Sequence, residues 1–304
     1  MTAVAASRKK PMTPQDILFN VICGVFFTLF ALLCFYPFYY LFICTISDPQ
    51  LVEVGQITVA PRGLTLESYA EVLKIDNLAN AAMISVLRSV LGTVTSTLCS
   101  AYLAYFFTKR NMWGRKFWYR LVVATMYFSA GMIPEYLNNR ALGLINTFWI
   151  YIIPGLVGVY NMILIKTSME SLPAELEESA VLDGAGYMTR FFRIVVPLQK
   201  PILATVALFL LVNHWNDFFT TQLYVTNPKN YTLQFLLYEF LNQVKNSANA
   251  VVTGNEGLTA TIQTVRTTSI RLTLTAVVII PIMLVYPFVQ KFYVKGVMIG
   301  AVKG

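Results

Sequence analysis

The sequence predicts an all-α integral membrane protein with six transmembrane helices. Hydrophobic residues make up 56% of the 304 residues and charged residues 12%, whereas a soluble domain has about 25% charged residues. The mean hydropathy is +0.60. Uncharged apolar runs recur along the chain, and several reach the roughly 20 residues that a helix needs to cross a bilayer. This composition leaves too little polar surface for a soluble globular protein of this size.

The first transmembrane helix is expected at about 17–46, because residues 17–47 carry no charge. Uncharged runs at 89–108, 141–165 and 272–290 predict further spans at about 84–108, 141–166 and 271–291. Two shorter runs extend to about 117–137 and 200–220 if Arg120 snorkels to the interface and the Asp217 carboxylate faces protein or water. We interpret 17–293 as one transmembrane domain between tails at 1–16 and 294–304.

The distribution of Lys and Arg predicts that both termini lie in the cytoplasm. In that orientation fifteen basic residues fall on cytoplasmic segments and six on outer segments, with Arg88 and Arg271 left uncounted at span ends. Cytoplasmic loops of membrane proteins carry such an excess of bases. Topology therefore explains the formal net charge of +8. No basic patch interleaved with aromatic residues indicates nucleic-acid binding.

The cysteines give no sign of a metal site. Cys23, Cys34, Cys44 and Cys99 lie in apolar runs without CxxC spacing, and His214 is the single histidine of the sequence. Cysteine in such places behaves as a small hydrophobic residue. We therefore interpret all four as packing residues and expect no metal.

The segment 170–198 is a polar island between two apolar runs. Five of the fifteen acids of the chain fall within fourteen residues of it, namely Glu170, Glu175, Glu177, Glu178 and Asp183. Pro173 suits the first turn of a helix, where acids are also favoured, and the glycines at 184 and 186 permit a sharp break. The segment predicts a helix, a glycine turn and a second short helix at about 187–195, on the cytoplasmic face. Its apolar side chains suit a groove on a partner protein.

The same segment carries a spaced motif: Glu-Ala-Ala, three residues, Gly, nine residues, Ile, one residue, Leu-Pro. It resembles the cytoplasmic coupling loop of binding-protein-dependent ABC importer permeases, with Ser179 in place of the first Ala and Val196 in place of Leu. The resemblance implies the type I importer permease fold and a loop that contacts a separate ATPase. The residues it implicates are Glu175, Glu178, Ala180, Asp183, Gly184, Phe191, Phe192, Ile194 and Pro197.

Further motifs resemble carbohydrate permeases of the maltose type, particularly the subgroup that serves complex oligosaccharides. They lie at 131–134, 142–147, 153–155, 214–217, 233–234 and 286–304. The resemblance implies a saccharide importer in the cell membrane of a prokaryote. Its partners would be a second homologous permease, two ABC ATPase subunits and an extracytoplasmic solute-binding protein. It also implies that the tail residues Lys303 and Gly304 reach the ATPase.

The chain is not expected to be an enzyme by itself. It has no phosphate-loop motif of Gly, four residues, Gly-Lys-Ser/Thr. We therefore expect no directly bound cofactor, with ATP and Mg²⁺ held by the partner ATPase. An ion-coupled secondary transporter is the first alternative, although no internal repeat is visible and the span centres are nearly free of charge. A membrane-bound enzyme acting on lipid-linked sugars is the second, although it would need paired acids or a His/Asp cluster.

Polar residues inside the predicted spans are candidates for a sugar pathway, because they are costly in a bilayer unless used. Asn213, Trp215, Asn216 and Asp217 cluster near the outer end of the fifth span, and Tyr127 lies in the third. Amide and carboxylate groups suit sugar hydroxyls, and aromatic faces suit the C–H side of a sugar. The alternative is structural, since Trp is common as an interfacial anchor and Asn or Asp can cap helices.

Overall fold

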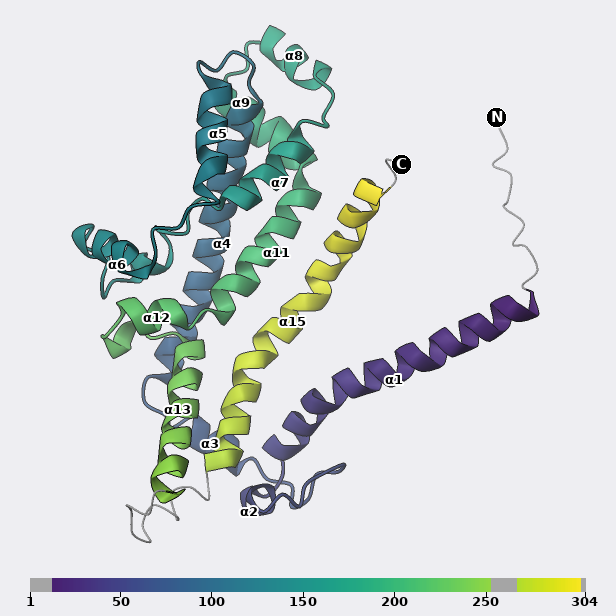
Figure 1. Cartoon of the computed structure of the whole chain (residues 1–304), viewed down its shortest axis with the longest axis vertical. Helices are drawn as coiled ribbons and strands as arrows, with labels where there is room; N and C mark the ends of the chain where they lie inside the picture. The colour runs from purple at the N-terminus through teal and green to yellow at the C-terminus, as the bar shows by residue number, and fades with distance from the viewer. Residues whose placement is uncertain (1–12, 253–266, 302–304) are drawn as a thin grey trace.

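The computed structural model describes residues 13–252 and 267–301, with side chains described for 13–242, 268–285 and 287. All regular structure in these residues is helical. Figure 1 shows α4, α7, α11 and α15 running along the body, with α1 projecting from it. The longer helices are α1 (Pro14–Thr45), α4 (Leu78–Thr108), α5 (Arg115–Thr125), α6 (Met132–Ala141), α7 (Val159–Met169), α11 (Lys200–Asn216), α13 (Leu233–Val252) and α15 (Thr267–Ala301). The shorter ones are α2 (Pro49–Glu53), α3 (Glu67–Val72), η1 (Phe148–Tyr151), α8 (Glu175–Leu182), α9 (Tyr187–Arg190), η2 (Phe191–Val195), α10 (Val196–Leu198), α12 (Phe219–Tyr224) and η3 (Pro228–Asn230).

α4 is the centre of the body because one of its faces carries small residues. Its buried positions include Gly92, Ala101 and Ala104 together with several Ser and Thr residues, and α11 and α7 pack against it. Small residues let membrane helices approach closely. At Gly92 a Cβ atom would lie 2.6 Å from the Nε2 atom of His214 on α11. A side chain at position 92 would therefore force His214 to move.

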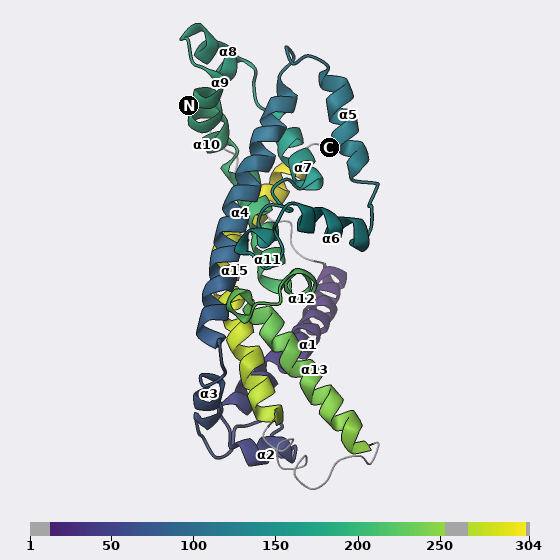
Figure 2. The ribbon, with the colours of Figure 1, turned by 90° about the vertical axis from the view of Figure 1, so that its left-hand side faces the viewer.

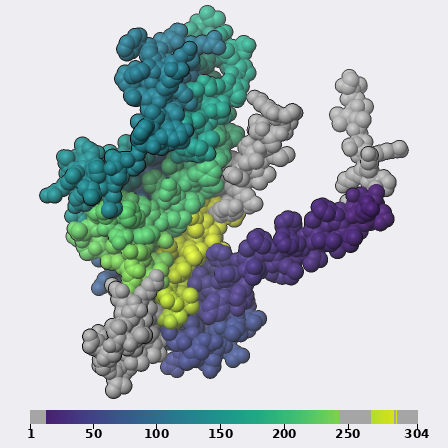
Figure 3. All heavy atoms as spheres, viewed as in Figure 1, coloured from purple at the N-terminus to yellow at the C-terminus, as the bar shows by residue number. Residues whose placement is uncertain are grey.

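α1 stands apart from the body over most of its length. It begins with a reciprocal capping box between Thr13 and Asp16. Its C-terminal end is buried at Leu41, Ile43 and Cys44 and packs on α15. None of the residues in its most apolar eighteen-residue window is buried, and Figure 3 shows the helix projecting freely. A helix that is apolar all round is stable only where lipid or another protein covers it.

Three helices are long and apolar enough to cross a membrane: Pro14–Thr45, Leu78–Thr108 and Thr268–Val285. A fourth candidate is the pair Tyr187–Leu198 and Lys200–Asn216, which is bent by 84°. These are the candidate spans among the described residues. α1 and α4 cover the predicted ranges 17–46 and 84–108 as continuous helices, and α15 covers 271–291.

The predicted spans 117–137 and 141–166 are not continuous helices. The first is divided between α5 and α6, and the second contains only η1 and the greater part of α7. The breaks occur where the backbone takes a left-handed conformation, at Gly131, Gly143 and Asn146, with φ of 88°, 68° and 61°. Helical residues have negative φ. The predicted range 200–220 is likewise broken, because α11 ends at Asn216 and α12 follows Phe218.

A hydrogen-bonded cluster joins the segment after α6 to the segment after α12. The Oδ1 atom of Asn146 accepts from the backbone N–H groups of Thr226 at 2.6 Å and Asn227 at 3.1 Å. The Tyr151 hydroxyl donates to the Asn230 carbonyl at 2.7 Å. The left-handed residue Asn146 is therefore held by contacts with residues about eighty positions later in the chain.

Candidate functional site

The acidic segment forms a compact helical loop at one end of the molecule, which we call the coupling loop (170–198). Figure 2 shows α8, α9 and α10 together at that end, beside the end of α4. The first turn of α8 contains Glu175, Glu177 and Glu178. Their negative charges interact favourably with the positive end of the helix dipole. The helix ends in a Schellman motif, because the Ala185 N–H donates to the Ala180 carbonyl at 2.9 Å and the Gly184 N–H to the Val181 carbonyl at 3.0 Å. Gly184 takes the left-handed position, with φ of +76°.

Gly184→Val is expected to loosen the end of α8. A β-branched residue in the left-handed region costs roughly 1–2 kcal/mol, and the cost is one of backbone strain because a Cβ atom here would contact nothing within 4 Å. Hydrogen exchange of the peptide covering 175–190 should accelerate by about tenfold. Gly186→Ala is the matched control, because the φ of Gly186 is −69° and its surroundings are also open. Equal exchange in both variants would contradict the expected role of Gly184.

Phe191 anchors the coupling loop in the core of the permease. Its side chain is 1% exposed and lies in the cluster formed by α4, α7 and α11. Its ring centroid is 5.2 Å from that of Tyr102 and 5.4 Å from that of Tyr105. Phe191 starts the short π-helical turn η2, so the chain bends immediately after the anchor.

An ion pair braces α8 against the end of α4. Lys109 Nζ contacts Glu177 Oε2 and lies 3.7 Å from the centroid of the Tyr105 ring. Burial lowers the pKa of Lys109, while the hydrogen bond and charge of Glu177 oppose that change. The pair therefore connects the coupling loop to the C-terminal end of α4.

A pair of reciprocal hydrogen bonds closes the base of the coupling loop. The Ser168 hydroxyl donates to Gln199 Oε1 at 2.6 Å, and Gln199 Nε2 donates to the Ser168 carbonyl at 3.2 Å. Gln199 is 4% exposed. The two ends of the loop are thus tied together, and the Phe191 anchor and the Lys109–Glu177 pair hold its interior. These contacts make the loop rigid relative to α4 and α7.

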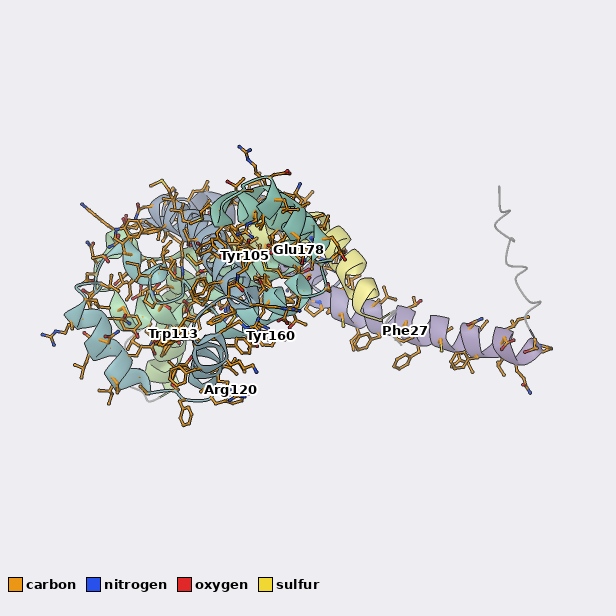
Figure 4. The ribbon with its side chains drawn as sticks, turned by 90° about the horizontal axis from the view of Figure 1, so that it is seen from above. Phe27, Tyr105, Trp113, Arg120, Tyr160 and Glu178 are labelled. Carbon is orange, nitrogen blue, oxygen red and sulfur yellow. The ribbon has the colours of Figure 1, made fainter. Side chains whose placement is uncertain are left out.

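The structure divides the predicted coupling residues into two groups. Glu175, Glu178, Asp183, Gly184, Phe192 and Pro197 are exposed, and Ile194 is half-buried. Ala180 and Phe191 are buried within the chain, so their side chains position the loop and are not available to contact a partner. Figure 4 shows Glu178 close to Tyr105 in the view from above, and both residues line one cavity.

The coupling loop also exposes an apolar surface, and apart from Phe192 its residues are not among those that the resemblance implicates. The large exposed apolar side chains are Leu176, Val181, Leu182, Tyr187, Met188, Phe192 and Leu198. Leu182 is the most exposed of them, at 88%. Exposed apolar groups at this density mark a protein or membrane contact. Apolar residues follow the acids of α8 in the sequence and could have indicated this surface. The spaced motif does not specify the residue types at those positions.

The predicted sugar-pathway residues do not form one cluster of free side chains. Trp215 Nε1 donates to the Val278 carbonyl of α15 at 3.1 Å. Asp217 contacts the Arg88 guanidinium and accepts from the Thr220 N–H at 3.1 Å. Asn213 and Asn216 are exposed, and Tyr127 is 73% exposed on the segment between α5 and α6. Trp215 and Asp217 therefore have structural contacts, whereas the other three side chains are exposed on this chain.

Sequence reasoning missed Arg88, which is the partner of Asp217. Arg88 is 3% exposed, its Nη1 donates to the Asp217 carbonyl at 2.8 Å, and its guanidinium lies 4.5 Å from the Tyr151 ring centroid. A lone basic residue near one apolar run and a lone acid near another were the available signal. The sequence by itself places Arg88 only at the end of a predicted span.

Comparison with known proteins agrees with this arrangement. The family model for binding-protein-dependent transport system inner membrane components matches residues 3–299. The polygalacturonan/rhamnogalacturonan transport system permease protein YtcP of Bacillus subtilis (strain 168) is 33% identical over 290 residues, which is 95% of this chain and 100% of that protein. Protein LplC of the same organism is 35% identical over 268 residues, covering 88% of this chain and 89% of that protein. A crystal structure of a bacterial ABC transporter involved in the import of the acidic polysaccharide alginate contains a chain with a TM-score of 0.81 and 28% identity, covering 94% of this chain and 100% of that one. The chain thus belongs to the family of binding-protein-dependent transport system inner membrane components.

Proposed function

We propose that this chain is one transmembrane half of an ATP-driven importer of an oligosaccharide or related saccharide, in the cell membrane of a prokaryote. The observation that carries the coupling part is the exposed, acidic and apolar surface of a loop that is braced to the body by Lys109–Glu177 and Phe191. A rigid loop of this kind transmits movement of a bound partner to the helices as a rigid body. The proposed partner is an ABC ATPase dimer, which would hold ATP and Mg²⁺.

The saccharide part of the proposal is supported by the relatives. One is described as a polygalacturonan/rhamnogalacturonan transport system permease, and the matching solved transporter as involved in alginate import. A further relative in Bacillus subtilis (strain 168) is described as a galactooligosaccharides transport system permease. Exposed amides and a phenol suit hydroxyl-rich ligands, so Asn213, Asn216 and Tyr127 are the residues we propose for the pathway. Trp215 and Asp217 would hold the helices that carry these residues in place, through their contacts with Val278 and Arg88.

The chain has one coupling loop, and an ATPase dimer would offer two binding sites for such loops. The proposed importer therefore contains two permease subunits. A second homologous permease would complete the pore, and an extracytoplasmic solute-binding protein would deliver the saccharide. We propose six membrane crossings, the segments 115–141 and 142–169 crossing as broken helices, with both termini in the cytoplasm. The tail residues Lys303 and Gly304 lie outside the described residues, and their contact with the ATPase remains part of the proposal.

Glu178→Lys is expected to uncouple transport from ATP hydrolysis. Glu178 is an exposed acid in the first turn of α8, so reversing its charge changes the partner surface without disturbing the core. Saccharide-stimulated ATP hydrolysis by the assembled importer in liposomes should fall by about tenfold or more, because loss of a charge-assisted contact costs roughly 1.5–3 kcal/mol.

Asp76→Lys is the matched control, since Asp76 is also exposed and lies on the predicted outer face. Its stimulated hydrolysis should equal that of the unchanged importer. Full stimulation in Glu178→Lys would remove this residue from the coupling contact. Uptake driven by an ion gradient without ATP would overturn the proposed function as a whole.

A further inference from the structure

A cavity of about 860 Å³ lies between the coupling loop and the end of α4. Its walls come from Tyr105 and Lys109 at the end of α4, from the α4–α5 connection, and from the coupling loop. Glu178, Val181 and Leu182 line the cavity and also belong to the exposed face that the proposed function assigns to the ATPase, whereas the buried Arg190 has no role in that function. The cavity is at the end of the molecule where the predicted topology places the cytoplasm.

The charges that line the cavity do not balance. Lys109 is paired with Glu177, and Glu170 is paired with Lys166 at 2.7 Å. The lining charges left over are three arginines, Arg110, Arg115 and Arg190, and one acid, Glu178. The described part of the cavity wall therefore carries an excess of positive charge, which favours an anion inside it.

Arg190 is the side chain that most clearly lacks a counterpart. It is 8% exposed, and its Nε atom is buried without a hydrogen-bond partner. Its guanidinium lies 4.4 Å from the Tyr187 ring centroid and pairs with no carboxylate of the described residues. Burying an unpaired charge is costly unless an opposite charge compensates it. Arg190 therefore lines the cavity with a buried donor, its Nε atom, that has no hydrogen-bond partner among the described residues.

The lining indicates the chemistry of the ligand. Guanidinium groups present a planar fork of donors that matches the oxygens of a phosphate group. Apolar residues, among them Leu172, Ile194 and Leu198, form other parts of the wall. Basic pockets at the cytoplasmic ends of transmembrane helices suit the head groups of anionic lipids. Trp113, which is 86% exposed on the neighbouring connection, is a residue type that prefers the membrane interface.

We propose that this cavity binds a phosphate-bearing anion, with Arg190 as the principal ligand and Arg110 and Arg115 as further cations of the lining. The phosphate belongs either to the head group of an anionic phospholipid or to a small soluble phosphate compound. A bound phosphate would neutralise the buried Arg190 and fill the space behind α8, and so stabilise the position of the coupling loop.

The test uses the assembled importer with Arg190→Gln, and with Arg193→Gln as the matched control, because Arg193 is exposed three residues further along the same loop. Each importer is reconstituted in vesicles of phosphatidylcholine and phosphatidylglycerol and then extracted. Native mass spectrometry counts the phosphatidylglycerol molecules that remain bound to it. A separate titration in lipid-free detergent records the shift of the melting temperature with inorganic phosphate. The unchanged importer and Arg193→Gln should bind phosphatidylglycerol or phosphate with the same affinity. The affinity of Arg190→Gln for that ligand should be lower by at least about tenfold.

Arg190→Lys keeps the positive charge and loses the planar guanidinium, so its affinity should lie between that of the unchanged importer and that of Arg190→Gln. The melting temperature of Arg190→Lys without ligand checks that the loop still folds. Retention of phosphatidylglycerol without a phosphate shift assigns the site to lipid, and a phosphate shift alone assigns it to a soluble compound. Equal binding by Arg190→Gln and the unchanged importer, or no binding by either, overturns the proposal. So does weaker ATPase association in Arg190→Gln with unchanged phosphate and lipid binding, because Arg190 would then pair with an acid of the ATPase.

Discussion

Asp217→Ala is expected to lower the free energy of unfolding by about 3–5 kcal/mol, because it leaves a buried arginine without its partner. The Arg88 side chain is 3% exposed and the Asp217 side chain 22% exposed, so water cannot replace the lost carboxylate on the arginine. The same carboxylate accepts from the backbone N–H and the hydroxyl of Thr220, and so it also caps α12. Chemical denaturation in detergent micelles would measure the loss.

Two further variants separate the ion pair from its surroundings. Asn216→Ala removes an exposed neighbour in the sequence and should change stability by less than about 0.5 kcal/mol. Arg88→Met combined with Asp217→Leu removes both charges and should recover most of the loss, because apolar replacement of a buried pair is often neutral. Equal stability of Asp217→Ala and Asn216→Ala would show that the pair contributes nothing to the fold.

Glu177→Lys is expected to displace the coupling loop from the body and, on the proposed function, to abolish stimulated ATP hydrolysis. It would place a third cation beside Lys109 and Arg190, both of which line the same cavity. Losing the charge-assisted bond to Lys109 costs roughly 1.5–3 kcal/mol, which corresponds to about a tenfold to hundredfold smaller population of the correctly placed loop. Saccharide-stimulated hydrolysis by the assembled importer in liposomes measures the effect.

The charge swap provides a strict control for that result. Lys109→Glu combined with Glu177→Lys restores an ion pair of reversed direction and should recover a large part of the stimulated hydrolysis. Glu170→Lys alters an ion pair between residues four positions apart whose acid is 46% exposed, and such surface pairs contribute only about 0–1 kcal/mol. It should therefore leave hydrolysis nearly unchanged. Failure of the swap to improve on Glu177→Lys would show that Glu177 acts through another contact.

The coupling loop was largely predictable, because local signals define it. The acids of its first turn, the glycine after α8 and the proline at 197 each act within a few residues along the chain. Spacing could not tell which side chains face outward, however. Phe191 and Phe192 are neighbours with similar chemistry, yet Phe191 is 1% exposed and Phe192 is 53% exposed. That difference depends on Tyr102 and Tyr105, which lie about ninety residues earlier.

The breaks in the predicted spans show a second limit of sequence reasoning. Hydropathy averages over about a bilayer thickness, and by that measure 117–137 and 141–166 qualify as single helices. Asn146 adopts a left-handed conformation because Thr226, Asn227 and Asn230 supply it with hydrogen bonds. Those partners lie on the far side of the coupling loop in the chain. A window of twenty residues cannot contain both sides of such a contact.

Composition alone was sufficient for the all-helical membrane class, because bulk transfer of apolar groups into lipid determines it. The acids, glycines and prolines within 170–198 were sufficient for the position of the coupling loop, and the resemblance of its motif to those of known importer permeases indicated the family. The ion pairs Arg88–Asp217 and Lys109–Glu177, the buried Arg190 beside its cavity and the division of the loop into inward and outward faces required the folded chain. They depend on which charges meet when distant helices pack, and on how far burial removes those charges from water. Packing geometry, which no local pattern encodes, determines both.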